Sequence, residues 1–100
     1  MSNNTETQVA TSVDDLNSFQ RDCIREISQN GPCNGLAVCS FLQKYYSSEV
    51  HHSRFYQNIE RLIEMGLVEK GQVNRRSNSY ELTSEGEQLA SELASRWKNV

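Results

Sequence analysis

The segment HHSRFYQNIERLIEMGLVEKGQVNRRSNSYELTSEG, residues 51–86, has a hydrophobic pattern that changes along its length. Up to Ile63 the apolar residues recur every three or four positions, which predicts a helix over roughly 51–65. After Gly66 apolar and polar residues alternate in GLVEKGQV and SNSYELT, and this alternation predicts two antiparallel strands. The short basic segment NRRSN lies between them, and we interpret it as the tip of a hairpin.

Further helices are predicted on both sides of this segment. A first helix begins at Asn17, which together with Gln20 resembles a capping box, and ends at the following NGP turn. A second helix starts after Asn34, and a last helix opens at Thr83 or Ser84 and runs to the chain end. Three helices, a two-stranded hairpin and a C-terminal helix make a mainly α fold, the winged helix-turn-helix. In that fold the third helix enters the DNA major groove, and the hairpin, or wing, reaches the flanking backbone or minor groove.

The length and composition indicate one small domain. The chain has 100 residues, of which 36% are hydrophobic. Residues 1–15 are polar and lack periodicity, so we expect a disordered arm, followed by the winged-helix domain over 16–100. No apolar run approaches the roughly 20 residues of a membrane span, and no signal peptide is apparent. We therefore expect a soluble, cytoplasmic protein that has no membrane partner.

The charges are segregated along the chain. Its formal net charge is -3, but residues 51–58 and 71–80 carry Arg54, Arg75, Arg76 and both histidines without any acidic residue. A basic patch of this kind suits a phosphate backbone even in an acidic protein. There is no carboxylate pair, nucleophile elbow, phosphate loop or zinc motif, so we expect neither an enzyme nor a cofactor.

Three parts of the sequence resemble the PadR-like winged-helix transcriptional regulators, most closely the short archaeal members. They are NGLAV (34–38), SRFYQNIERLIEMGLVEKG (53–71) and SNSYELTSEGEQL (77–89), and the resemblance covers roughly residues 17–90. The chain departs from the family at Gln57, where many relatives have proline, and in a C-terminal region too short for a long coiled coil. The resemblance implies a DNA-binding homodimer and leaves any small-molecule effector unspecified. The matching positions of the third helix and the turn after it are Tyr56, Ile59, Arg61, Leu62, Gly66 and Leu67.

The candidate DNA contacts lie on the third helix and at the hairpin tip. Arginine can bond guanine through two donors, and glutamine or asparagine can pair similarly with adenine. These rules favour Ser53, Arg54, Gln57 and Asn58 as base contacts, with the two histidines and Tyr56 bonding phosphate, capping the helix or packing. The helix candidates are His51, His52, Ser53, Arg54, Tyr56, Gln57, Asn58 and Arg61, and the wing candidates are Asn74, Arg75, Arg76, Ser77 and Asn78.

The last helix, 83–100, is the candidate dimerisation helix. Its apolar stripe of Leu89, Leu93 and Trp97 would be exposed if the other elements already close a core. The family resemblance, together with the small core, implies a symmetric homodimer through the first and last helices, with Phe19 as the candidate on the first helix. The alternative is that the last helix folds back and completes the core of its own chain.

The three cysteines do not suggest a disulfide framework, because their number is odd. Cys23 falls on the apolar face of the first helix, and the spacing of Cys33 and Cys39 matches no Cys-x-x-Cys zinc pattern, so no metal site is expected. Cys33 lies in the NGPCNG turn and is the candidate redox-active thiol. Two alternatives to a simple DNA-binding regulator thus stay open: a protein-interaction winged helix, and a thiol-based redox sensor that acts through DNA.

Overall fold

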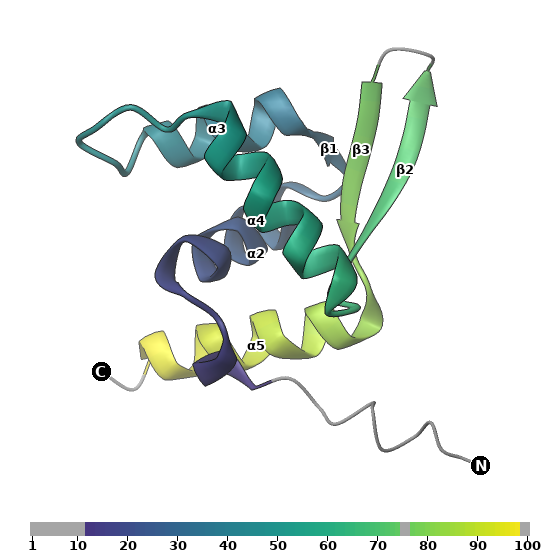
Figure 1. Ribbon diagram of the computed structural model, residues 1–100. Coiled ribbons are helices and arrows are strands. Elements are labelled where there is room, and N and C mark those ends of the chain that lie inside the picture. The colour runs from purple at the N-terminus through teal and green to yellow at the C-terminus, as the bar shows by residue number, and fades with distance from the viewer. Residues whose placement is uncertain (1–11, 75–76, 99–100) are drawn as a thin grey trace.

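The computed structural model describes residues 12–74 and 77–98 of the chain. Three helices, a hairpin and a last helix follow one another in the predicted order, so the winged helix-turn-helix fold is confirmed (Figure 1). No helix in these ranges is both long and apolar enough to cross a membrane. The elements are η1 (Val13–Asp15), α2 (Ser18–Asn30), β1 (Cys33–Asn34), α3 (Gly35–Gln43), α4 (His52–Glu64), β2 (Val68–Asn74), β3 (Ser77–Leu82) and α5 (Ser84–Lys98).

The folded domain begins earlier than the sequence suggested. Ser12 and Asp15 form a capping box around the short 3-10 helix η1, and Val13 within it is only 3% exposed. Residues 12–15 therefore belong to the domain and not to the expected arm of residues 1–15. Residues 1–11 lie outside the described part of the chain.

Asparagine side chains start the first two α-helices. The Asn17 side chain accepts from the amide of Gln20, and the Gln20 side chain accepts from the amide of Asn17, which confirms the predicted capping box. Asn34 caps α3 in the same way, through the amide of Ala37. Gly31 ends α2 with a φ of 70°, a backbone conformation that glycine adopts without steric cost.

The sheet has three strands in the order β1-β3-β2, one more than predicted. The third is β1, whose Cys33 pairs with Tyr80 of β3 in antiparallel register. A strand of two residues cannot display an alternating pattern, so its sequence carries no strand signal. Its pairing joins the start of α3 to the base of the hairpin.

The apolar stripe of α4 lies at the centre of the domain, as predicted. Phe55, Ile59 and Leu62 are completely buried, and the Phe55 ring packs edge-on against Tyr80 at 6.0 Å between centroids. Each such side chain contributes about 1.5–3 kcal/mol of hydrophobic free energy on burial. The stripe therefore orients α4, and the opposite face of the helix is turned to solvent.

A close backbone approach joins α5 to the turn that follows α4. The Thr83 hydroxyl donates to the carbonyl oxygen of Gly66 and accepts from the amide of Gly86. The Thr83 amide donates to the carbonyl oxygen of Leu67 at 3.0 Å. A Cβ atom at position 86 would overlap that same carbonyl oxygen, so only glycine fits there.

We predict that Gly86→Ala destabilises the domain despite its position in a helix. Alanine is favoured over glycine in a helix by about 1 kcal/mol, whereas overpacking typically costs about 1–3 kcal/mol and occasionally more. The overlapping atom belongs to the backbone and cannot rotate away, so the steric cost should exceed the gain. Urea unfolding of this variant, with Ser91→Ala on the exposed face of α5 as the control, measures the difference. A variant as stable as the unaltered protein would contradict the packing at this junction.

Candidate functional site

The start of α4 and the outer end of the β2–β3 hairpin lie on the same side of the domain, whereas α5 runs along the opposite side (Figure 1). The 3.6-residue period puts Ser53 and Gln57 opposite the buried stripe, and both are exposed. In the part of the chain that the structure describes, neither side chain bonds another residue. We call Ser53 and Gln57 the reading face. Their hydroxyl and amide groups can meet an external partner without first breaking a contact.

Two acidic residues continue the outward side of α4 toward its C-terminus, and both are paired. Glu60 lies 3.6 Å from the ammonium of Lys70 on β2, and Glu64 lies 3.3 Å from the guanidinium of Arg61. Exposed pairs of this kind contribute little stability, at most about 1 kcal/mol. These two ion pairs balance the charge of the second half of α4. Arg61, a predicted DNA contact, is the partner of Glu64 in one of them. The first half carries no acidic residue.

The N-terminus of α4 has no side-chain cap. His51 occupies the N-cap position without making a capping hydrogen bond, so the capping role considered for it is wrong. Its Nδ1 atom lies 3.9 Å from a Glu49 carboxylate oxygen, and both side chains are well exposed. His52, the first helical residue, is exposed too. The amides of the first turn therefore face outward with the positive end of the helix dipole, an arrangement that favours anions.

Arg54 lies on the flank of α4 and differs from the expectation of a base contact. Its guanidinium carbon is 4.2 Å from the centroid of the Phe19 ring and 5.7 Å from that of Tyr46. Both rings belong to the body of the domain, one to α2 and the other to the loop after α3. In this arrangement the cation is directed toward α2, away from the reading face.

Asn58 and Tyr56 are engaged on opposite flanks of the same helix. The Asn58 amide donates to the Arg54 carbonyl oxygen at 2.8 Å and accepts from the Asn17 side chain at 3.3 Å, so it joins α4 to the start of α2. Tyr56 is 40% exposed, and its hydroxyl lies where a side chain at Gly35 would come within 2.7 Å of it. Asn58 is thus a bridging residue, and Tyr56 is partly exposed with its hydroxyl packed beside Gly35.

The wing candidates are only partly visible. Asn74 and Ser77 pair across the two strands next to a register shift, and the Asn78 side chain is exposed. Arg75 and Arg76 lie outside the described residues, so their predicted role stays a prediction. Their place in the chain, between the outer ends of β2 and β3, is that of the hairpin tip.

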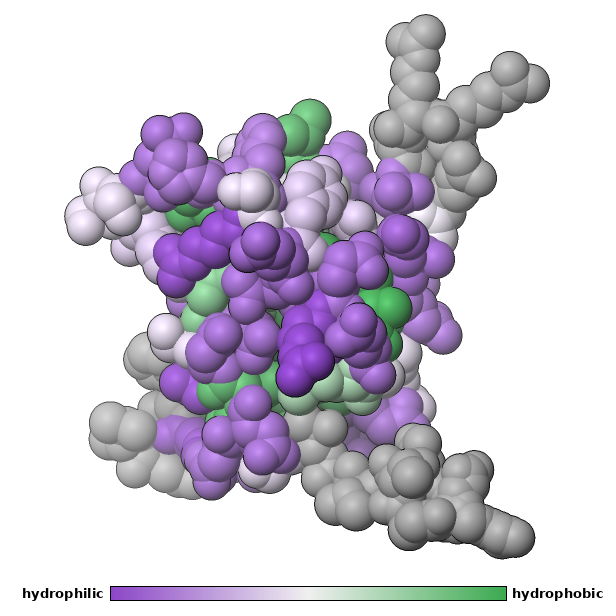
Figure 2. Space-filling model, viewed as in Figure 1, coloured by the Kyte–Doolittle hydropathy of each residue, from purple (hydrophilic) through white to green (hydrophobic). Residues whose placement is uncertain are grey.

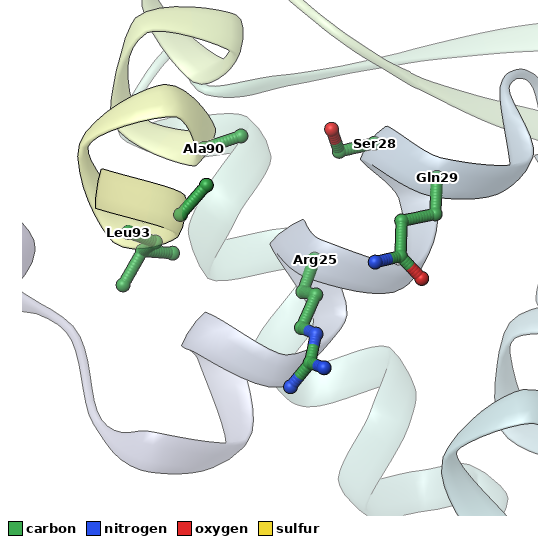
Figure 3. A pocket seen from close by; sticks show the side chains of 6 residues that line it. Arg25, Ser28, Gln29, Ala90 and Leu93 are labelled. Atoms are coloured by element: carbon green, nitrogen blue, oxygen red, sulfur yellow. The ribbon is translucent and has the colours of Figure 1, made fainter. Parts of the chain in front are cut away.

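Three of the four dimerisation candidates belong to the core of their own chain. Phe19, Leu89 and Leu93 are 2%, 4% and 8% exposed, because α5 folds back onto α2. Leu89 and Leu93 thus pack in the core of their own chain, the arrangement given as the alternative for the last helix, while the side chain of Trp97 lies outside the described part. A hollow of about 320 Å³ remains between α2 and α5. Figure 3 shows Arg25, Ser28 and Gln29 of α2 around it, with Ala90 and Leu93 of α5 on the other side.

The cysteines lie in surroundings that disfavour the thiolate. Cys23 and Cys39 are buried, whereas Cys33 is partly buried in β1 and was expected to be exposed in a turn. Burial, and next the carboxylate of Glu26, raise the pKa of Cys33. Reactive thiols usually have a lowered pKa, so redox sensing by Cys33 gains no support from its electrostatics and stays a prediction. Within the described residues no cluster of three metal-binding side chains occurs.

The supporting contacts of α4 are what sequence reasoning missed. Tyr46 donates a hydrogen bond to Asp22, and Lys70 reaches Glu60, over 24 and 10 positions of the chain respectively. Pairs so distant leave no periodic signal in one sequence. The only available signal was the position of Arg54 and Asn58 beside the apolar stripe, on one flank of the helix.

Comparison with known proteins agrees with this fold. The family model for the transcriptional regulator PadR-like family matches residues 24–92. A complex structure of hsRosR is 36% identical, with a TM-score of 0.75, covering 84% of this chain and 71% of the other. A structure of RosR from H. salinarum is 35% identical, with a TM-score of 0.73, covering 85% and 77%.

More distant structures share the fold alone. BpsR from Bordetella bronchiseptica is 18% identical, with a TM-score of 0.74, over 90% of this chain and 65% of its own. No curated protein sequence matches significantly. The family consists of transcription regulators and not of enzymes, as expected from the absence of catalytic motifs. With its family model covering more than half of the chain, the protein belongs to the transcriptional regulator PadR-like family.

Proposed function

We propose that this DNA-binding transcription regulator acts as a cytoplasmic homodimer that recognises specific sequences in double-stranded DNA. The first half of α4 enters the major groove, and the wing lies on the flanking backbone or in the minor groove. The observation that carries this proposal is the reading face, where Ser53 and Gln57 project to solvent from an acid-free half-helix. An amide such as that of Gln57 can bond N6 and N7 of adenine together.

Phosphate contacts would position this face. The uncapped N-terminus of α4 presents free amides and a partial positive charge. Tyr56 is 40% exposed next to the start of α3, and Arg75 and Arg76 follow β2 in the chain. Such contacts fix the register of a protein on the duplex but do not distinguish bases. Sequence recognition is therefore assigned to the reading face.

The surface in front of α4 favours DNA over a protein partner. Figure 2 shows that this face is mostly hydrophilic, with only small apolar areas. Protein interfaces depend on buried aromatic and aliphatic anchors at their centre. A polar surface with amide and hydroxyl groups suits base edges and phosphates better.

The first test concerns Gln57. Gln57→Ala should reduce the preference for the operator over random DNA by about 1–3 kcal/mol, because a base contact of two hydrogen bonds is lost, one donated and one accepted by the side-chain amide. Operator fragments can be selected from the DNA upstream of the protein's own gene by footprinting, and the preference measured by fluorescence anisotropy.

The matched control is Gln88→Ala, which removes the same side chain from an exposed position on α5. It should leave the preference unchanged. An unchanged preference in Gln57→Ala would place the reading surface elsewhere, and a protein that selects no DNA fragment at all would favour the protein-interaction alternative.

The second test concerns the wing. Replacing both Arg75 and Arg76 with alanine should weaken binding to operator and random DNA by similar factors, because phosphate contacts carry no sequence information. Each lost contact should also lower the slope of log K against log salt by about 0.9. Titrations at several salt concentrations measure both effects.

Arg96→Ala, which removes a cation from α5, is the control for the wing variant. It should keep the salt slope of the unaltered protein. If the wing variant keeps its affinity and slope but loses operator preference, the wing reads bases in the minor groove instead.

The proposed dimer uses the α2–α5 side of the domain. Supporting it are the hollow between these helices, the exposed Ala94 at its rim, and the family resemblance. A domain of this size also buries only about 60–65% of its unfolded surface, so a second subunit would add to its stability. In this dimer, side chains of the second copy would fill the hollow. Leu89 and Leu93 would not form the interface, because both are buried in the core of their own chain.

We predict that Ala94→Arg yields a folded monomer. A long cation at the rim of the hollow obstructs the second copy sterically and is costly to desolvate. Gln88→Arg adds the same side chain elsewhere on α5 and should remain dimeric. Light scattering and circular dichroism distinguish dissociation from unfolding. A monomeric unaltered protein would contradict the proposed dimer.

A further inference from the structure

We infer that Arg54 is a positioning residue, which sets the orientation of the reading face through α2 and does not itself read a base. This inference rests on the proposed DNA-binding function. It changes the assignment that the sequence favoured, because arginine near the start of a recognition helix is the side chain most suited to guanine.

The first observation is the platform under the guanidinium. Phe19 is 2% exposed and belongs to the core, so its ring cannot move away independently of α2. The guanidinium carbon of Arg54 lies 4.2 Å from the centroid of this ring, well within the range of a cation–π contact. To reach a base, Arg54 would have to leave this contact and expose the ring.

The second observation is how the neighbouring ring is held. Tyr46 lies 5.7 Å from the guanidinium and packs edge-on against Phe19 at 5.7 Å between centroids. Its hydroxyl donates to the carboxylate of Asp22, so the ring is fixed to α2 at its far end as well. Burial and this hydrogen bond raise the pKa of Tyr46 to about 12, which keeps the hydroxyl a donor at neutral pH. The two rings and the carboxylate thus form a preassembled seat.

The third observation concerns the backbone of the same residue. The Arg54 carbonyl oxygen accepts from Asn58, which also accepts from Asn17, the N-cap of α2. Side chain and backbone are therefore both tied to the first turn of α2. We call Asn17, Phe19, Tyr46 and Asp22 the α2 clamp.

The clamp determines what Ser53 and Gln57 can reach. Both are within one turn of Arg54, so a rotation of this part of α4 would displace them together. Productive base contacts require placement within about 0.5 Å. Loss of the clamp should accordingly weaken preference at several base pairs, whereas loss of a reading side chain abolishes preference at one.

The test compares Arg54→Met, Arg54→Lys and Phe19→Leu, with Gln57→Ala as the matched reader. Affinity is measured for the operator and for every single-base-pair substitution of it. If Arg54 acts through the clamp, Arg54→Met should lower operator affinity about two- to thirtyfold, which is the range of a cation–π contact. The lost discrimination should be distributed over several base pairs of the operator. Arg54→Lys should largely restore the profile, because lysine keeps a cation over the ring.

Phe19→Leu should reproduce the profile of Arg54→Met, and the double variant should lose little more than either single one. The inference would be overturned if the affinity losses of the two single variants add up in the double variant. It would also be overturned if Arg54→Met and Arg54→Lys both lose all discrimination at one and the same base pair. Lysine cannot replace arginine in a two-donor contact to guanine.

A measurement without DNA separates this inference from the proposed function. Amide hydrogen exchange at the hydrogen-bonded amides of α4 from Phe55 onward should be accelerated about two- to thirtyfold in Arg54→Met. The exchange rate should be unchanged in Gln57→Ala. Because this comparison needs only Arg54→Met and Gln57→Ala, it tests the clamp even where Phe19→Leu fails to fold. Unchanged exchange in Arg54→Met overturns the clamp. Accelerated exchange in a protein that selects no DNA supports the clamp and refutes the proposed function.

Discussion

The carbonyl oxygen of Leu67 is the point on which the arrangement of the domain depends. It accepts the amide of Thr83, and the backbone of Gly86 passes so close to it that no side chain fits. The end of α4, the base of the hairpin and the first turn of α5 meet at this place. Since backbone atoms cannot rotate away as side chains can, the contact holds the three elements in one geometry. The recognition helix and the wing consequently project from a shared base.

The two flanks of α4 serve different purposes around that base. One flank contacts α2 through Arg54 and Asn58, and the other contacts the sheet through Lys70 and Glu60. With the apolar stripe beneath, α4 is supported on three sides, and only its outward side remains for a ligand. The polar side chains of α4 are thus divided between those that contact the rest of the domain and those that face solvent, such as Ser53 and Gln57. Such supporting contacts matter because a binding surface distinguishes one ligand from another only when its side chains are held in the correct geometry.

The sequence predicted the helices, the hairpin, the cap at Asn17 and the buried stripe of α4, because each depends on residues near one another in the chain. It did not predict β1, which is too short to show a period and exists only because Tyr80 pairs with Cys33. The stripe of α5 was ambiguous for a related reason. Amphipathicity shows that a face is buried but does not show whether its partner is the same chain or another.

By itself the sequence determined the order of elements and the resemblance to the family, since periodicity and capping chemistry are local properties. Only the tertiary structure shows which polar side chains of α4 contact the rest of the domain and which face solvent. Arg54 and Gln57 are both polar and both suited to bases, but one lies over Phe19 and the other faces solvent. The difference arises from about 100° of helix rotation per residue, combined with the place where α2 happens to pack. That packing is a contact between distant parts of the chain, and it brings Leu89 and Leu93 into the core in the same way.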